Sequence, residues 1–324
     1  MNKKIGVILV IALIALIAMG TASAGMFDFL NGGSSNKVTI GYLPSDHDAA
    51  LFVAEKQGLY EKKGIKVELV QFNNGGDLMT AMASGQVDVG YVGIAPVLSS
   101  VAKGVPVKVI SSAQTEGSGI IVTKDSGIKS AADLKGKSIA TPGEASIQHV
   151  LLSNYLDKNG LSIKDLNVSA MKVPSMNDAL KTKQIDGIIT FQPYVSIAAN
   201  DTNNVVLENS SGILPNHPCC VVVASDDFIK NHENETKNII EIHNESTKFI
   251  NDNIKSGNTS EVVKLLPEDI VSNADLEALS LQSFPFISGI DNSFKADVDS
   301  FQNLEVKLGI LNSTVPQDKL YWEA

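Results

Sequence analysis

The polar side chains best suited to binding or catalysis follow short apolar segments of the chain. Asp46 and His47 come directly after the apolar segment 38–43, while Glu116 and Glu144 stand in later loops that contain glycine. Carboxylates and an imidazole can bind an amine or a metal ion, or move a proton. Their spacing matches no metal-binding motif, so no metal site is predicted. The same acids could instead cap helices or point into solvent.

Glycine-containing loops form a second chemical signal. Four loops, at 44–48, 73–77, 93–96 and 142–146, follow apolar segments, and three of them run directly into a helical pattern. The first amides of a helix lack partners and carry a partial positive charge, so such loops can bind an anion without a charged side chain. Each glycine alone is explained by an ordinary turn. The coincidence of several such loops favours a binding site.

All 26 basic residues are lysine, and the formal net charge is −10. Without arginine, no bidentate guanidinium can clamp a carboxylate, phosphate or sulfonate. The acidic balance also argues against a nucleic-acid partner. If two of the loop acids face a cleft, they repel a bare divalent anion. The sequence then favours a zwitterion, an amine-bearing compound or a neutral heterocycle as ligand.

The chain has two cysteines, Cys219 and Cys220, and they are neighbours in the apolar segment 218–224. A disulfide between adjacent cysteines is strained, and no zinc-type spacing surrounds them. We expect both to be packed side chains of a strand. No cationic group is predicted beside them, so neither is expected to act as a nucleophile, and no catalytic residue is assigned.

The elements that must position these residues alternate along the chain. Short apolar segments, typical of buried strands, alternate with helical patterns and brief loops, which predicts parallel α/β architecture. The expected strands are 38–43, 66–72, 87–92, 107–113, 119–124, 137–142, 168–173, 187–191, 204–209 and 218–225. The expected helices are 49–64, 77–85, 95–104, 145–160 and 175–184. From about residue 226 onward the periodicity is helical.

The first residues have the pattern of an export signal. Lys3 and Lys4 precede the apolar segment 5–19, and an Ala-x-Ala site ends at Ala24. We expect residues 1–24 to be a signal peptide and residues 25–36 to be a flexible linker. An uncleaved membrane anchor is the alternative. Either outcome predicts an exported protein, periplasmic or attached to the cell surface.

Several segments together resemble one family. The quoted residues are IGYLPSDHDAALFVAEKQGLYEKKGIKVELVQFNNGGDLMTAMASGQVDVGYVGIAP, followed by DLKGKSIATPGEASIQHVLLSNYLDKNGL and HPCCVVVASDDFIKNHE. The chain resembles the substrate-binding proteins of ABC importers for nitrate, sulfonates and taurine, including relatives that bind pyrimidine precursors of thiamine. The resemblance extends from residue 37 to about residue 320.

The resemblance implies a two-lobed, type II periplasmic-binding-protein fold with a helical C-terminal extension on lobe one. Lobe one would comprise 37–115 and 218–324, and lobe two would comprise 116–217. A small solute would bind between the lobes as they close. The partners would be an ABC permease and its ATPase, with no cofactor and no membrane contact except through the transporter or an uncleaved anchor. The expected ligand-binding residues are Ser45, Asp46, His47, Gly75, Gly76, Gly93, Ile94, Ala95, Thr115, Glu116, Glu144, Ala145, Ser146 and Gln192.

The function implied is therefore capture of a solute for import, without enzymatic activity. Taurine-like zwitterions and alkanesulfonates rank first as ligands, followed by pyrimidine precursors, nitrate and bicarbonate. One alternative is an enzyme that processes pyrimidine precursors on the same fold. Another is the ligand-sensing ectodomain of a signalling system.

Overall fold

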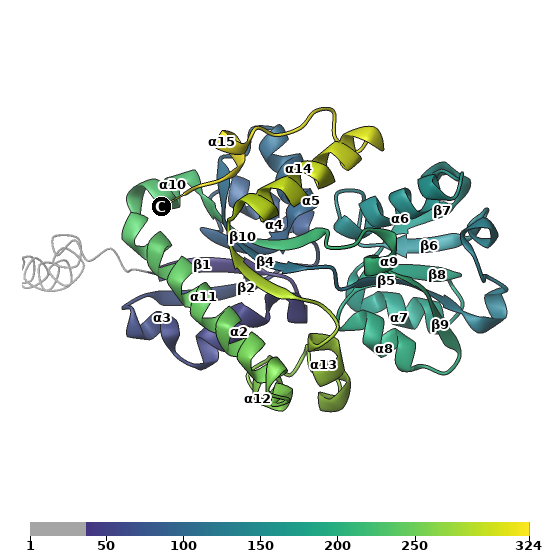
Figure 1. Ribbon diagram of the computed structural model, residues 1–324, viewed down its shortest axis with the longest axis horizontal. Coiled ribbons are helices and arrows are strands. Elements are labelled where there is room, and N and C mark those ends of the chain that lie inside the picture. Colours follow the sequence, from purple (N-terminus) through teal and green to yellow (C-terminus); the bar gives the residue numbers. More distant parts are fainter. Residues whose placement is uncertain (1–36, 324) are drawn as a thin grey trace, which may run out of the picture. The chain divides into compact units, whose positions relative to one another are not determined.

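The computed structural model describes residues 37–323. The predicted signal peptide and linker lie outside these residues. Among the described residues, two β-sheets are each covered by helices (Figure 1). No helix in this part of the chain combines the length and the apolar character that crossing a bilayer requires.

The first sheet has a mixed strand direction. Among the described residues its order is β11 (Phe286–Gly289), β4 (Val107–Thr115), β10 (Pro218–Ser225), β3 (Val89–Gly93), β1 (Lys37–Tyr42) and β2 (Lys66–Gln71). Strands β1 and β3 are parallel, whereas β10 is antiparallel to both β3 and β4. The predicted parallel α/β architecture is therefore present in β1 and β3, while the direction of β10 makes the sheet mixed.

The second sheet is mixed as well. Its order is β7 (Asn167–Ala170), β6 (Ser138–Thr141), β8 (Gly187–Phe191), β5 (Ser118–Thr123) and β9 (Asn204–Asn209). Strand β6 is parallel to β7 and β8, but β5 is antiparallel to β8 and β9. Strands β5 and β10 each follow a passage of the chain from one sheet to the other. The apolar patterning does not encode their direction.

The alternation of side chains along β10 explains why this strand is apolar throughout. Val221 and Val223 face one hydrophobic cluster, while Val222 and Ala224 face another. Helices cover both faces of the sheet (Figure 1). On one side lie α4 (Gly75–Ala83), α5 (Ile94–Ala102) and α14 (Asn292–Lys307), and on the other lie α2 (Ala49–Lys56) and α11 (Glu233–Lys255). A strand buried on both faces has no polar positions to alternate with.

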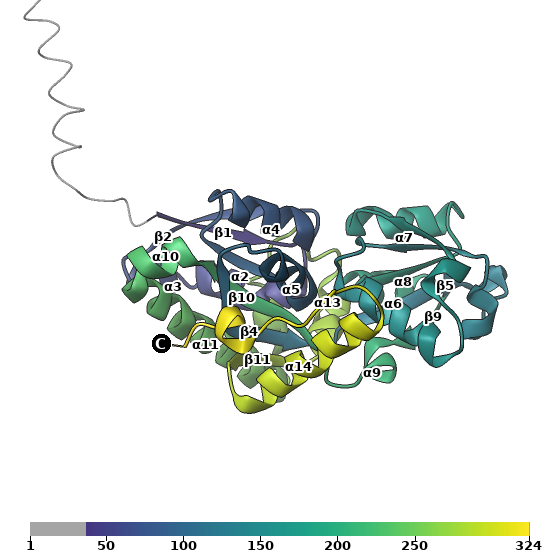
Figure 2. The ribbon, with the colours of Figure 1, turned by 90° about the horizontal axis from the view of Figure 1, so that it is seen from above.

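Most predicted helices are present with small shifts of their ends. The first one divides at Gly58, which has a left-handed φ of 65°, into α2 and α3. The helices that follow strands are α2 (Ala49–Lys56), α3 (Leu59–Lys62), α4 (Gly75–Ala83), α5 (Ile94–Ala102), α6 (Ile147–Lys158), α7 (Val173–Lys181), α8 (Tyr194–Asn200) and α9 (Ser210–Ile213). Figure 2 shows α7 and α8 on the second sheet and α4 and α5 on the first.

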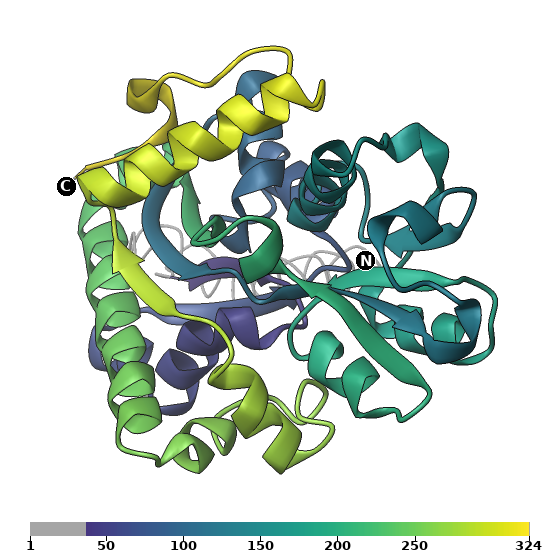
Figure 3. The same cartoon turned by 45° about the vertical axis from the view of Figure 1, so that its right-hand side comes forward.

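The C-terminal region is mainly helical but contains a strand that the sequence pattern missed. Its helices are α10 (Asp226–Asn231), α11 (Glu233–Lys255), α12 (Thr259–Val263), α13 (Ala274–Leu281), α14 (Asn292–Lys307) and α15 (Gln317–Leu320). Helix α11 packs on α2 and β11, and α14 packs on β10 and α5. Figure 3 shows α11 in green and α14 in yellow on either side of strand β11. Strand β11 pairs antiparallel with β4 and so closes the edge of the first sheet.

Candidate functional site

A cavity of about 280 Å³ is lined by residues that follow strands of both sheets. Eight of the predicted ligand-binding residues line it: Ser45, His47, Gly75, Gly76, Gly93, Glu144, Ala145 and Ser146. These residues come from four separate segments, which follow β1, β2, β3 and β6. The structure therefore brings together the four loops that the sequence singled out.

Three helices begin at the cavity. The side chain of Asn74 caps α4, accepting a hydrogen bond from the amide of Asp77 at 2.9 Å. Gly93 precedes α5, and the hydroxyl of Ser146 caps α6 by accepting from the amide of His149 at 3.2 Å. Because free amides and the helix dipole give each N-terminus a partial positive charge, three of them at one cavity favour an anionic group.

Three predicted residues lie near the cavity but do not line it. Asp46 is fully buried and accepts a hydrogen bond from the hydroxyl of Ser280 at 2.5 Å. The main-chain oxygen of Gln192 accepts from the hydroxyl of Ser45 at 2.7 Å. The side chain of Gln192 is held by Ser283 and by the amide of Ser196. Glu116 lies outside the lining too.

The side chain of Glu116 instead supports the passage between the sheets. Its Oε1 accepts a hydrogen bond from the amide of Asn216 at 2.8 Å. The backbone of Glu116 has a left-handed φ of 64°. Thr115 is the last residue of β4, and Ile94 and Ala95 are buried in the first turn of α5. None of these three lines the cavity. Their places in the sequence were close to the site, but their side chains belong to the framework.

Several lining residues were not among those predicted. Asp48, Gln148, Phe191, Cys219 and Cys220 all contribute to the cavity wall. Asp48 lies in the predicted loop 44–48, and Gln148 is a close neighbour of the predicted residues in the loop 142–146. No signal in the sequence pointed to the two cysteines, because residues of an apolar strand are ordinarily core.

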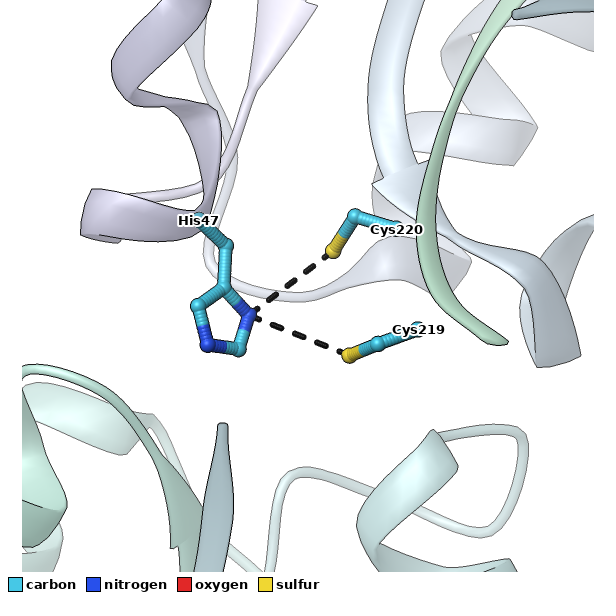
Figure 4. Close-up of side chains that lie close together, drawn as sticks. All are labelled: His47, Cys219 and Cys220. Atoms are coloured by element: carbon cyan, nitrogen blue, oxygen red, sulfur yellow. Dashed lines mark hydrogen bonds between the residues drawn. The ribbon is translucent and has the colours of Figure 1, made fainter. Parts of the chain in front are cut away.

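Figure 4 shows that the imidazole of His47 faces both cysteines. Its Nδ1 lies 3.8 Å from Sγ of Cys219 and 3.9 Å from Sγ of Cys220. Successive strand residues normally point to opposite faces, but the pairing of β10 with β4 shifts register at Cys220. This irregularity lets both sulfur atoms approach one ring. The prediction that no cationic group lies beside the cysteines is therefore wrong.

The electrostatics of this cluster favour separated charges. A hydrogen bond from Cys220 and the nearby His47 hold the pKa of the Cys219 thiol well below its usual range. Burial disfavours the imidazolium of His47, but Cys219 outweighs this effect, so the pKa of His47 is raised. A thiolate and an imidazolium stabilise each other in this arrangement. His47 also packs edge-on against Phe284, with the ring centres 4.7 Å apart.

Two carboxyl groups line the cavity. Burial raises the pKa of Asp48 to about 8, so this side chain is mostly protonated at neutral pH. Glu144 is exposed at the opposite wall. No lysine is among the residues that line the cavity in the described part of the chain. The cavity therefore combines helix N-termini, one imidazole and few ionised acids.

Comparison with known proteins gives the family. The model of the NMT1-like family matches residues 31–267, which is most of the chain. The chain belongs to the NMT1-like family. Within the curated proteins, this NMT1-like chain is 25% identical over 305 residues to 4-amino-5-hydroxymethyl-2-methylpyrimidine phosphate synthase of Schizosaccharomyces pombe, covering 88% of the chain and 84% of that protein. It is 26% identical over 277 residues to the putative aliphatic sulfonates-binding protein of Bacillus subtilis, covering 83% and 81%.

Solved structures give the same fold. The NMT1-like chain superposes on the alkanesulfonate-binding protein SsuA of Xanthomonas axonopodis pv. citri, bound to MOPS, with a TM-score of 0.78 and 22% identity. The match covers 89% of this chain and 98% of that structure. The prediction of a periplasmic-binding-protein fold is thus confirmed.

Proposed function

We propose that this NMT1-like protein is the extracytoplasmic solute-binding component of an ABC importer and that it captures a sulfonate or taurine-like solute. One observation carries the proposal: the N-termini of α4, α5 and α6 meet at a single cavity. Main-chain amides at these termini can hold a sulfonate group without any arginine. The similarity to an aliphatic sulfonates-binding protein supports this solute class.

For delivery to a transporter, the ligand-bound protein must differ in conformation from the free protein. We assign lobe one to 37–115 and 218–324 and lobe two to 116–217, with the ligand between them. Residues of both segments line the cavity, so a ligand there touches both. The ligand then stabilises the closed arrangement through contacts that exist only on closure. A permease and its ATPase would be the partners that receive the closed form.

The test is a ligand screen on the full chain by thermal shift and calorimetry. Ethanesulfonate, taurine, nitrate, bicarbonate and an aminopyrimidine are the ligands to compare. A ligand at a hundred times its dissociation constant stabilises the fold by about 2.7 kcal/mol. We expect a sulfonate to give the largest shift. Binding of the aminopyrimidine alone would overturn the solute class, and no binding at all would overturn solute capture.

A second candidate is an enzyme that acts on a pyrimidine precursor. Two observations favour it: the similarity to a pyrimidine phosphate synthase and the contact of the Cys219 thiol with the imidazole of His47. The two functions separate in an assay for product. A carrier releases its ligand unchanged, whereas an enzyme releases a new compound that mass spectrometry detects. Product that is lost in Cys219→Ser would favour the enzyme.

A further inference from the structure

His47, Cys219 and Cys220 place three metal-ligating atoms at the distances a small cation requires. The imidazole nitrogen and the two sulfur atoms all lie within 4.8 Å of one another, with N···S separations of 3.8 Å and 3.9 Å. In a tetrahedral zinc site the bond lengths place N and S about 3.6 Å apart and two S atoms about 3.8 Å apart. The two N···S separations are therefore within a few tenths of an ångström of the tetrahedral value, and the two sulfur atoms, which lie within 4.8 Å of each other, would move closer together around the ion.

The surrounding structure holds these three side chains in place. Both cysteines are free, buried and on a central strand of the first sheet. His47 lies in the short 3-10 helix Asp46–Asp48, and its ring packs between Phe191 and Phe284. Nδ1 of His47 is the atom that faces the sulfurs, whereas Nε2 is buried and has no hydrogen-bond partner in the described part of the chain. The three ligands come from rigid elements.

We propose that His47, Cys219 and Cys220 bind a thiophilic cation, Zn²⁺, at the wall of the cavity. All three residues line the cavity, so the fourth coordination position faces its interior. Three protein ligands with one open position are the arrangement of zinc sites that accept an exogenous ligand. Thiolate and imidazole ligands select Zn²⁺ or Cu(I) over Mg²⁺ and Ca²⁺, which prefer oxygen.

Metal binding changes the ionisation of the cluster. Cysteine and histidine bind a metal ion in their deprotonated forms, so Zn²⁺ binding releases protons. Two thiolates and a neutral imidazole balance the charge of the ion, so the site adds an open coordination position to the cavity without adding a net charge. This site does not depend on the proposed import function, because metal binding is measured without any solute.

The test is calorimetric titration of the reduced full chain with Zn²⁺. We expect one ion per chain, with affinity at least tenfold weaker in Cys219→Ser and in Cys220→Ser, and no measurable binding in the double variant. His232→Gln is the matched control, because His232 lies at the junction of α10 and α11, away from the cavity, and stacks on Phe228. This control should retain the wild-type affinity.

A measurement on the unchanged chain keeps the test decisive if the serine variants do not fold. Co²⁺ replaces Zn²⁺ in tetrahedral sites and gives an intense thiolate-to-metal charge-transfer band when cysteine is a ligand. The band should appear at one equivalent, and Zn²⁺ should abolish it and protect both thiols from alkylation. No Zn²⁺ binding, binding that survives in the double serine variant, or a Co²⁺ spectrum without the thiolate band would each overturn the proposal.

Discussion

Gly75 and Gly76 both bring main-chain amides to the cavity wall, but they differ in the space around their Cα atoms. A Cβ at Gly75 would lie 2.6 Å from Cγ of Pro96, a contact that cannot form without displacement. A Cβ at Gly76 would lie 3.2 Å from Oδ1 of Asn74, a half-buried side chain, and a shift of a few tenths of an ångström relieves this contact. Changes at these neighbouring positions should therefore have different effects.

We predict that Gly76→Val weakens binding of the solute at least tenfold and leaves the midpoint of thermal unfolding nearly unchanged. The added methyl groups occupy the cavity beside the start of α4. Gly75→Ala should instead destabilise the fold by about 1–3 kcal/mol through overpacking against Pro96. Calorimetric titration and urea denaturation measure the two effects. Wild-type affinity in Gly76→Val would mean that the solute binds elsewhere.

We expect Glu144 to distinguish two kinds of sulfonate. Its carboxylate lines the cavity near the N-terminus of α6 and is exposed, so its effect is moderated by solvent. We predict that Glu144→Gln strengthens binding of ethanesulfonate two- to threefold, because a repulsive charge is removed. Binding of taurine should weaken by a similar factor if its ammonium group faces Glu144. Affinities that change in the same direction for both ligands would contradict this role.

At the scale of elements, the sequence pattern predicted where strands occur better than how they pair. The apolar segment that became β10 was located correctly, but a strand buried on both faces reads the same in either direction. Strand β11 was missed because its four residues are too few to show alternation, and its pairing with β4 supplies the stability that local pattern does not. Pairing partners distant in sequence are decided by packing.

The same reasoning explains the errors at the site. Asp46 and Asp48 are two residues apart in one turn, yet Asp48 lines the cavity and Asp46 turns toward Ser280. Only the packing of the C-terminal helix α13 against this turn decides which acid faces inward. The cluster of His47 with Cys219 and Cys220 joins segments more than 170 residues apart. The spacing of residues within a local sequence motif cannot predict such a contact.

Helix α14 carries a buried acid that makes stability depend on pH. Glu305 is 1% exposed, and burial raises its pKa to about 8, against about 4.3 in an unfolded chain. Between these two values the native chain binds this proton more tightly, so the contribution of Glu305 to stability is fully present below about pH 4 and is lost as pH rises toward 8. Glu277, with a pKa raised to about 9, contributes with the same sign.

We predict that Glu305→Gln increases the free energy of unfolding at pH 8 by on the order of 2 kcal/mol and changes it little at pH 5. The amide keeps the shape of the side chain but has no charge to bury. Urea denaturation at both pH values measures the difference, with the exposed Glu241→Gln as the matched control. An equal effect of Glu305→Gln at pH 5 and pH 8 would show that this carboxyl does not ionise on unfolding.

At the scale of the whole molecule, a few polar contacts link the elements of the first sheet to those of the second. The hydroxyl of Ser45 donates to the main-chain oxygen of Gln192, and the side chain of Gln192 donates to Ser283 at 3.0 Å. Helices α8 and α13 are also in contact. If ligand affinity depends on closure, contacts of this kind contribute to affinity without touching the ligand.

Ser283→Ala tests this dependence. Ser283 does not line the cavity. Its hydroxyl accepts a hydrogen bond from the side-chain amide of Gln192, so the variant removes one hydrogen bond between the segments 116–217 and 218–324. A hydrogen bond contributes about 1 kcal/mol, which predicts a solute affinity about fivefold weaker. Ser300→Ala, which removes an exposed hydrogen bond within α14, should leave the affinity unchanged. The readout is calorimetric titration together with small-angle scattering, because loss of closure should leave more of the ligand-bound chain in the open form. Unchanged affinity in Ser283→Ala would mean that the ligand binds to a preformed cavity, since a closure-linked site must lose affinity when the closed form loses a contact.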